Sequence, residues 1–258
     1  MPNERTIDLN ADLGEAYGPW RMGDDAALMP LISSANLACG LHAGDPDVMR
    51  AAVRCALAHG TAIGAHPGYD DLQGFGRREL GLSPAAIENR VAYQVGALAA
   101  IAALAGGRLR HVKAHGALYN RAWDDAAAAS AIVRAVCAVD ASLILFAPAA
   151  SRLLDEAHAA GLKVAVEIFA DRAYDEDGRL LARDRAGALI TEPAVCAGRV
   201  LAMLTAGALI TAGGRHITTA IDSVCLHGDT PTALAIAQRV RDALLAAGWR
   251  MAPPARPT

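Results

Sequence analysis

Short apolar runs alternate with longer amphipathic segments along almost the whole chain. The apolar runs have the length and the aliphatic, β-branched composition of buried strands. They predict seven strands, at residues 6–10, 33–38, 61–65, 109–113, 143–146, 163–169 and 223–226. The segments between them have helical periodicity and predict helices at residues 45–59, 83–104, 124–139, 149–160, 192–206 and 230–247. Residues 208–218 fit neither pattern clearly.

Local signals mark several of these boundaries. Asp45 and Ser83 each precede a proline, which combines a capping side chain with proline at the first helical position. Gly60 stands where the first of these helices should end. Two long polar loops, at residues 68–81 and 170–187, interrupt the alternation.

Strands that alternate with helices predict a parallel sheet covered by helices, either as a closed barrel or as a doubly wound open sheet. No glycine-rich dinucleotide loop or Walker A loop follows an early strand. Polar residues instead follow almost every strand, as they do at the catalytic end of a barrel. We therefore expect an α/β fold, a TIM-barrel-like β/α barrel of seven parallel strands. It should form one domain over residues 1–258, with a disordered tail at 253–258.

Composition narrows the class of protein. The chain has 258 residues, 53% of them hydrophobic but only 4% aromatic, so one large aliphatic core is expected. A net charge of −3 without a basic stripe argues against nucleic acid as a partner. Apolar stretches such as residues 95–104 are too short for a membrane span. Five scattered cysteines and no signal peptide favour a reducing cytoplasm without disulfides.

The first strand carries a polar face. Asp8, Asn10 and Asp12 alternate and should point into the barrel, where burying them is costly unless they bind something. We interpret the three as ligand-binding or catalytic residues, the alternative being a polar strand end with turn-forming side chains. Glu15 follows in the loop and is a separate candidate.

Histidines follow the next two strands. His42 lies in a glycine-rich turn and His66 ends its strand, so both should reach the same rim as Asp12. Two histidines and an aspartate would suit a divalent ion such as zinc or manganese. Asp45 is better explained as a helix cap, and Cys39 as a packing residue.

Later strand ends add positive charge and further proton carriers. Lys113 and His115 are two residues apart, so Lys113 could neutralise an anion and His115 could transfer protons. Arg77 or Arg78 could bind a carboxylate, unless their loop is simply solvated. His111 is interpreted as structural, as are the three histidines outside the strand ends, His59, His158 and His216.

The last two sectors hold acidic and basic groups. Glu167 lies inside an apolar strand and needs a partner. Asp171 and Arg172 follow it, either as a surface pair or as part of the site. His227 follows the last strand and is a stronger chemical candidate than the residues after it, which read as a helix cap.

Six strings among these segments resemble the LamB/YcsF family of prokaryotic 5-oxoprolinase A subunits. They are DLNADLGE at 8–15, ACGLHAGDP at 38–46, GAHPGY at 64–69, VKAHGALYN at 112–120, EIFADRAY at 167–174 and LHGDTP at 226–231. The strings are long, unusual and in order over nearly the whole chain. Ala114 replaces a usual proline and Leu41 a frequent phenylalanine, and neither change removes a reactive group.

The resemblance implies a barrel of the glycoside hydrolase/deacetylase type and ATP-dependent opening of 5-oxo-L-proline to L-glutamate. It also implies B and C partner subunits, and it leaves a homo-oligomer open. The absence of a Walker A loop means that ATP binds in another way here or at a partner subunit. Two alternatives remain: a stand-alone metal-dependent deacetylase-like hydrolase acting on carbohydrate or amide, and a non-catalytic regulatory barrel.

Residues and resemblance together predict one ring-shaped site. The expected catalytic residues are Asp12, His42, His66, Lys113 and His115, with Asp12, His42 and His66 as the candidate metal ligands. The expected substrate-binding residues are Asn10, Glu15, Asn36, Arg77, Asn120, Glu167, Asp171, Arg172 and His227. ATP is the expected co-substrate.

Overall fold

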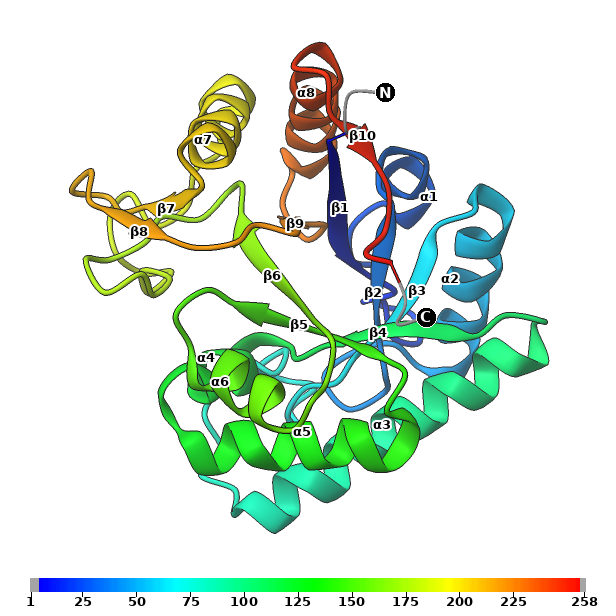
Figure 1. The fold of residues 1–258 in the computed structure, drawn as a ribbon. Helices are drawn as coiled ribbons and strands as arrows, with labels where there is room; N and C mark the ends of the chain where they lie inside the picture. Colours follow the sequence, from blue (N-terminus) through cyan, green and yellow to red (C-terminus); the bar gives the residue numbers. More distant parts are fainter. Residues whose placement is uncertain (1–4, 256–258) are drawn as a thin grey trace.

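The computed structural model, which describes residues 5–255, is a closed barrel of seven parallel strands wrapped by helices (Figure 1). The barrel strands follow the chain: β1 (Thr6–Leu13), β2 (Ser34–Ala38), β3 (Ala62–His66), β4 (Leu109–Lys113), β5 (Ile144–Pro148), β6 (Val164–Phe169) and β9 (Ser223–His227). The last strand, β9, pairs with both β6 and β1, which closes the barrel. The predicted fold class is confirmed.

Six helices lie where amphipathic segments predicted them: α2 (Pro46–His59), α3 (Pro84–Leu104), α5 (Ala126–Asp140), α6 (Arg152–Ala159), α7 (Pro193–Ala206) and α8 (Ala233–Ala246). The predicted caps are confirmed as well. The Asp45 carboxylate accepts the backbone N–H groups of Asp47 and Val48, and Gly60 ends α2 in the left-handed conformation.

The short elements were not predicted. They are α1 (Asp25–Leu28), the 3-10 turn η1 (Met29–Leu31), α4 (Gly116–Asp124), the antiparallel pair β7 (Ala208–Ile210) and β8 (His216–Thr218), and β10 (Arg250–Met251) beside the start of β1. The helix predicted at 124–139 begins two residues later, at Ala126, because the Asp125 carboxylate accepts the backbone N–H groups of Ala127 and Ala128. This cap separates the helix from α4. The unassigned segment 208–218 forms the β7–β8 hairpin, which lies beside α7 outside the barrel (Figure 1).

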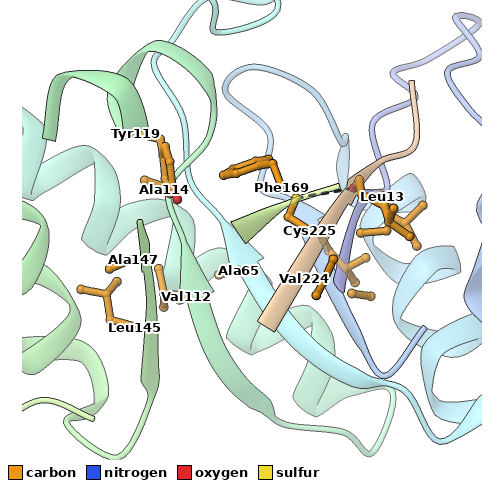
Figure 2. Close-up of a cluster of buried hydrophobic side chains, with 14 of the residues drawn as sticks. Leu13, Ala65, Val112, Ala114, Tyr119, Leu145, Ala147, Phe169, Val224 and Cys225 are labelled. Atoms are coloured by element: carbon orange, nitrogen blue, oxygen red, sulfur yellow. Dashed lines mark hydrogen bonds between the residues drawn. The ribbon is translucent and has the colours of Figure 1, made fainter. Parts of the chain in front are cut away.

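Alternation along each strand separates an apolar layer from a polar interior. On β1, Leu9 and Ala11 are fully buried against the helices, while the intervening polar side chains face inward. In Figure 2, Leu145 and Ala147 of β5 project toward the surrounding helices in the same way. Each fully buried aliphatic side chain of the size of leucine contributes about 1.5–3 kcal/mol. This apolar layer stabilises the barrel, so the interior can hold polar groups.

The C-terminal segment runs along the outside of the barrel. The Arg110 guanidinium donates from Nη2 and Nε to the Pro254 carbonyl oxygen, at 3.0 and 3.2 Å. The tail predicted to be disordered, 253–258, is thus anchored at Pro254, and residues 256–258 lie outside the described residues. Within residues 5–255, no helix is both long and apolar enough to cross a membrane.

Candidate active site

The inward side chains form a lower polar layer deep in the barrel. Asp8 is buried and accepts hydrogen bonds from the hydroxyls of Ser33, Ser34 and Ser223, at 2.6 and 2.7 Å for the first two. Burial raises the pKa of Asp8 from 3.8 to about 6. These contacts join β1 to both of its neighbouring strands.

Two amides continue this layer upward. The Asn36 side-chain N–H donates to Asn10 Oδ1 at 2.7 Å and to Asp12 Oδ1 at 2.9 Å. The His111 ring donates to Asn36 Oδ1 at 2.8 Å and stacks on Phe146. The amides therefore fix the position of the Asp12 carboxylate from below.

Lys113 stands at the centre of the barrel and is only 2% exposed. Its Nζ lies 3.1 Å from Asp12 Oδ1, 3.2 Å from Glu167 Oε2 and 2.8 Å from Cys225 Sγ. A buried ammonium needs such compensation, and it comes here from two carboxylates and a sulfur. Because its three donors are already engaged, Lys113 is placed to hold Asp12 rather than to contact a developing anion.

His66 and His115 face each other above Lys113. The His66 Nδ1 lies 2.8 Å from the Lys113 carbonyl oxygen, and the His115 Nε2 lies 2.8 Å from the Phe75 carbonyl oxygen. A carbonyl only accepts, so both of these ring nitrogens carry the proton in the neutral rings. The remaining nitrogens, His66 Nε2 and His115 Nδ1, lie 3.0 Å apart and would point two lone pairs at each other.

Such a contact calls for a cation between the two rings. The Asp12 Oδ2 atom lies 3.4 Å from His66 Nε2, and the potential ligand atoms of Asp12, His66 and His115 all lie within 4.8 Å of one another. Two imidazoles held by outer hydrogen bonds and one carboxylate form a donor set typical of a divalent transition metal. These three residues therefore fit a metal ion.

His42, predicted as a metal ligand, lies one step away from this group. Its ring stacks on His115 at 3.8 Å between centroids, and both of its buried nitrogens lack a hydrogen-bond partner in the described part of the chain. A second possible group of ligand atoms joins His42 and His115 with Glu15. The structure thus brings His115, in place of His42, to the side of Asp12 and His66.

The two carboxyl groups at this point have opposite electrostatics. Burial alone would raise the pKa of Asp12, but the charges of His66 and Lys113 hold it well below the usual range. Burial, together with repulsion from Asp12, raises the pKa of Glu15 well above its usual range. A carboxyl group with a lowered pKa suits a ligand role, and one with a raised pKa suits proton transfer.

A second histidine–carboxylate pair, His227 and Asp171, lies at the end of β9, the strand next to β1. His227 pairs in register with Asp12 across β9 and β1. Its Nδ1 lies 2.9 Å from Asp171 Oδ2, which orients the ring and leaves Nε2 free to exchange a proton. Burial alone would raise the pKa of Asp171, but the charge of His227 lowers it, so the carboxylate is ionised.

These groups border a cavity of about 470 Å³ at the carboxyl ends of the strands. Its floor holds Asp12, His66, Lys113 and His115. Apolar walls come from Phe169 and from loop and helix residues, and Figure 2 shows Phe169 reaching across toward Tyr119. The volume suits a small molecule with a short apolar body.

Comparison with known proteins identifies the family. The LamB/YcsF family matches residues 7–258. The chain belongs to the LamB/YcsF family. It is 56% identical over 249 residues to a Rhodopseudomonas palustris (strain BisB18) protein named as the A subunit of 5-oxoprolinase, and the match covers 96% of this chain and 98% of the relative. The resemblance drawn from the six strings is confirmed.

Solved structures agree with this assignment. The lactam utilization protein from Thermus thermophilus is 45% identical, with a TM-score of 0.90 over 96% of this chain and 99% of that one. A family 4 carbohydrate esterase from Streptomyces lividans is 12% identical, with a TM-score of 0.51 over 98% and 97% of the two chains. The second similarity concerns the fold alone.

The structure gathers most of the predicted site in this family member. Nine predicted residues line the cavity: Asp12, Glu15, His66, Arg77, Lys113, His115, Asn120, Arg172 and His227. Five others, Asn10, Asn36, His42, Glu167 and Asp171, do not line it and instead lie beneath or behind the residues that do. Their hydrogen bonds and ring contacts favour support of the site over direct contact with a substrate.

Several contributors were missed by sequence reasoning. Cys225 was treated only as a scattered cysteine, although it is in contact with Lys113. Arg183 lies in the polar loop predicted at 170–187, but the sequence could not show that this loop folds over the cavity.

The two arginines of the other long loop have different partners. Asp229, predicted to be part of a helix cap, instead pairs with Arg77 at 2.6 Å. Arg78, the alternative to Arg77, binds Asp71 away from the cavity. The sequence alone could not show which carboxylate pairs with Arg77 and which with Arg78, because this depends on the conformation of the loops.

Proposed function

We propose that this chain is the A subunit of a 5-oxoprolinase and that its cavity opens the lactam ring of 5-oxo-L-proline to give L-glutamate. The observation that carries the proposal is the floor of the cavity, where the Asp12 carboxylate and the two facing histidines His66 and His115 meet, with the Glu15 carboxyl group also lining the cavity. Hydrolysis of an amide needs an activated carbonyl, a positioned water and a proton for the leaving nitrogen. Groups suited to each task border this cavity.

Asp12, His66 and His115 would hold a divalent metal. When bound, such an ion would polarise a carbonyl oxygen and lower the pKa of a water molecule. Lys113 keeps the Asp12 carboxylate in place, and the Lys113 carbonyl oxygen fixes the His66 ring through its Nδ1 proton. These two contacts act as the outer shell that orients the ligands.

The remaining steps are proton transfers by residues of this chain. As water adds to the lactam carbon and the C–N bond breaks, the ring nitrogen must gain a proton to leave as an amine. His227 is suited to supply it, because Asp171 holds the ring in place through Nδ1. Glu15 lines the same cavity, and in its ionised form it is suited to accept a proton from the attacking water.

In this proposal, ATP binding involves the partner subunits. Cleavage of an unstrained lactam is difficult, and coupling to ATP hydrolysis would drive it. The chain has no Walker A loop, so we assign nucleotide binding to the B and C subunits or to a site they complete with this chain. The names of the relatives, which describe each of them as an A subunit, support an assembly with further subunits.

Reconstitution tests this function directly. The chain is mixed with its B and C partners, ATP and 5-oxo-L-proline, and glutamate is measured, with B plus C alone as the control. We expect glutamate only when all three chains and ATP are present. Equal glutamate in the control would refute a catalytic role for this chain.

A stand-alone metal-dependent deacetylase-like hydrolase is the second candidate, favoured by the facing histidines and by the barrel type. It predicts hydrolysis of an acetylated sugar or amide by the metal-loaded chain without ATP. The same preparation, assayed on N-acetylated sugars without partners, separates the two functions.

A further inference from the structure

A guanidinium group without an anionic partner lies buried in the wall of the cavity. Arg172 is only 5% exposed, yet its Nε has no hydrogen-bond partner among residues 5–255, and its Nη2 donates to the Leu181 carbonyl oxygen. The adjacent Asp171 carboxylate is bonded to His227. A buried charge in this state is costly unless a ligand completes it.

A second arginine approaches the same place. Arg183 lines the cavity from the β6–α7 loop and is about half-buried. Within residues 5–255, neither Arg172 nor Arg183 lies within ion-pair distance of a carboxylate. Burial lowers the pKa of Arg172 to about 10, and the charge of Arg183 adds to this effect.

The other arginine and lysine side chains that line the cavity, Arg77 and Lys113, are already paired with carboxylates. The Asp184 carboxylate also lines it but, among the described residues, lies outside ion-pair distance of both Arg172 and Arg183. Arg77 is paired with Asp229 at 2.6 Å, and its guanidinium lies over the Phe75 ring. Lys113 is bonded to Asp12 and Glu167. Arg77, which the sequence suggested as the carboxylate clamp, is thus occupied, and the unbalanced positive charge lies at Arg172 and Arg183.

We propose that Arg172 and Arg183 form a carboxylate subsite, so that the cavity selects small cyclic amides that carry a carboxylate group. This inference rests on the proposed function for the identity of the amide. Planar guanidinium groups bind carboxylates through paired N–H···O bonds, which fix the orientation of the ligand. With the carboxylate held at this wall, the apolar ring would lie against Phe169 and Leu181, which line the same cavity.

Binding of two lactams to the full chain tests the subsite. Equilibrium dialysis compares 5-oxo-L-proline with 2-pyrrolidinone, which has the same ring without the carboxylate. We expect 5-oxo-L-proline to bind about 10- to 100-fold more tightly, the usual contribution of hydrogen bonds to charged groups. Equal binding of the two, or no binding of 5-oxo-L-proline, overturns the subsite.

Substitutions of the two arginines test whether they cause the preference for the carboxylated ring. Arg183→Met breaks no hydrogen bond of the described side chains, and Arg172→Lys keeps a charge while losing the planar fork. Both should remove most of the preference for the carboxylated ring. Arg185→Met is the matched control, because Arg185 is exposed on the same loop and does not line the cavity. It should bind as the parent does, and thermal melting verifies that each variant is folded.

Inorganic phosphate serves as the competing anion. Phosphate binding that depends on Arg172 and Arg183, with lactam binding unchanged in both variants, would overturn the carboxylate assignment. The result is separable from the proposed function. A parent chain that shows no preference for the carboxylated ring refutes the subsite even where the assembled enzyme releases glutamate, whereas arginine-dependent binding without glutamate release refutes only the proposed function.

Discussion

The lower polar layer and the mouth of the barrel, by which we mean the residues that line the cavity, both contain buried polar side chains. They differ in how fully these side chains are hydrogen-bonded. In the lower layer, Asp8 accepts three serine hydroxyls, and Asn36 bonds to Asn10 and Asp12. At the mouth, His66 and His115 turn lone pairs toward each other, and the Arg172 Nε has no partner. The lower layer is not completely closed, since His111 Nδ1 lacks a partner among the described residues. Its carboxylate and amides are nevertheless hydrogen-bonded within the protein and stabilise the barrel, whereas the incomplete groups that line the cavity mark the place of a ligand.

The largest expected effect of a substitution at the mouth is at the two facing histidines, His66 and His115. We expect His66→Ala and His115→Ala to lower glutamate release by the assembled enzyme by about 10³-fold or more, since a metal supplies several kcal/mol of transition-state stabilisation. Titration calorimetry with Zn²⁺ and Mn²⁺ provides a readout independent of activity. Binding should be lost in both variants and retained in His158→Ala, because His158 is exposed on α6. Unchanged metal affinity in His66→Ala would contradict the assignment.

The same distinction explains how far the sequence could predict the site. Alternation on β1 was enough to place Asp8, Asn10 and Asp12 on one face, because strand geometry has a period of two. It could not rank them, since Asp8 and Asp12 differ only in their partners on β2, β4 and β9. Those partners are distant in sequence and meet only when the barrel closes.

Loops were less predictable than strands for the same reason. His42 and His66 occupy similar positions at the ends of neighbouring strands, but the turn after β2 places the His42 ring in a stack on the His115 ring and not beside Asp12. The fold itself was easier, because helix caps such as Asp45 and apolar strands act locally. α4 was missed because it begins after His115, which makes no capping side-chain bond and was read as part of the site.

The next largest effect should appear in the lower layer, as a change in stability. Because burial raises the pKa of Asp8 from 3.8 to about 6, folding favours its protonated form. Its stabilising contribution is full below about pH 4 and is lost as the pH rises through 6. The stability of the parent relative to Asp8→Asn, which does not titrate, should therefore fall by up to about 3 kcal/mol between pH 4 and pH 7.

Urea unfolding of both proteins across this pH range measures that difference. Other titrating groups are shared and cancel. A difference that does not vary with pH would show that Asp8 is ionised in the fold throughout. The variant should also keep its affinity for 5-oxo-L-proline when folded, because Asp8 does not line the cavity, and a large loss of affinity would remove the distinction between the two layers.

The smallest expected effect lies at Cys225, on the boundary between the layers. Its Sγ is 2.8 Å from Lys113 Nζ and fully buried. Cys225→Ser keeps an acceptor for the ammonium and should change the free energy of unfolding by less than about 1 kcal/mol, whereas Cys225→Ala removes the acceptor and should cost about 1–3 kcal/mol. Neither should change Zn²⁺ affinity by more than a few-fold, because Asp12 retains its contacts with Lys113 and Asn36. If Cys225→Ser lowered Zn²⁺ affinity as strongly as His66→Ala, the sulfur would belong to the mouth, and the boundary between the two layers would lie below Lys113.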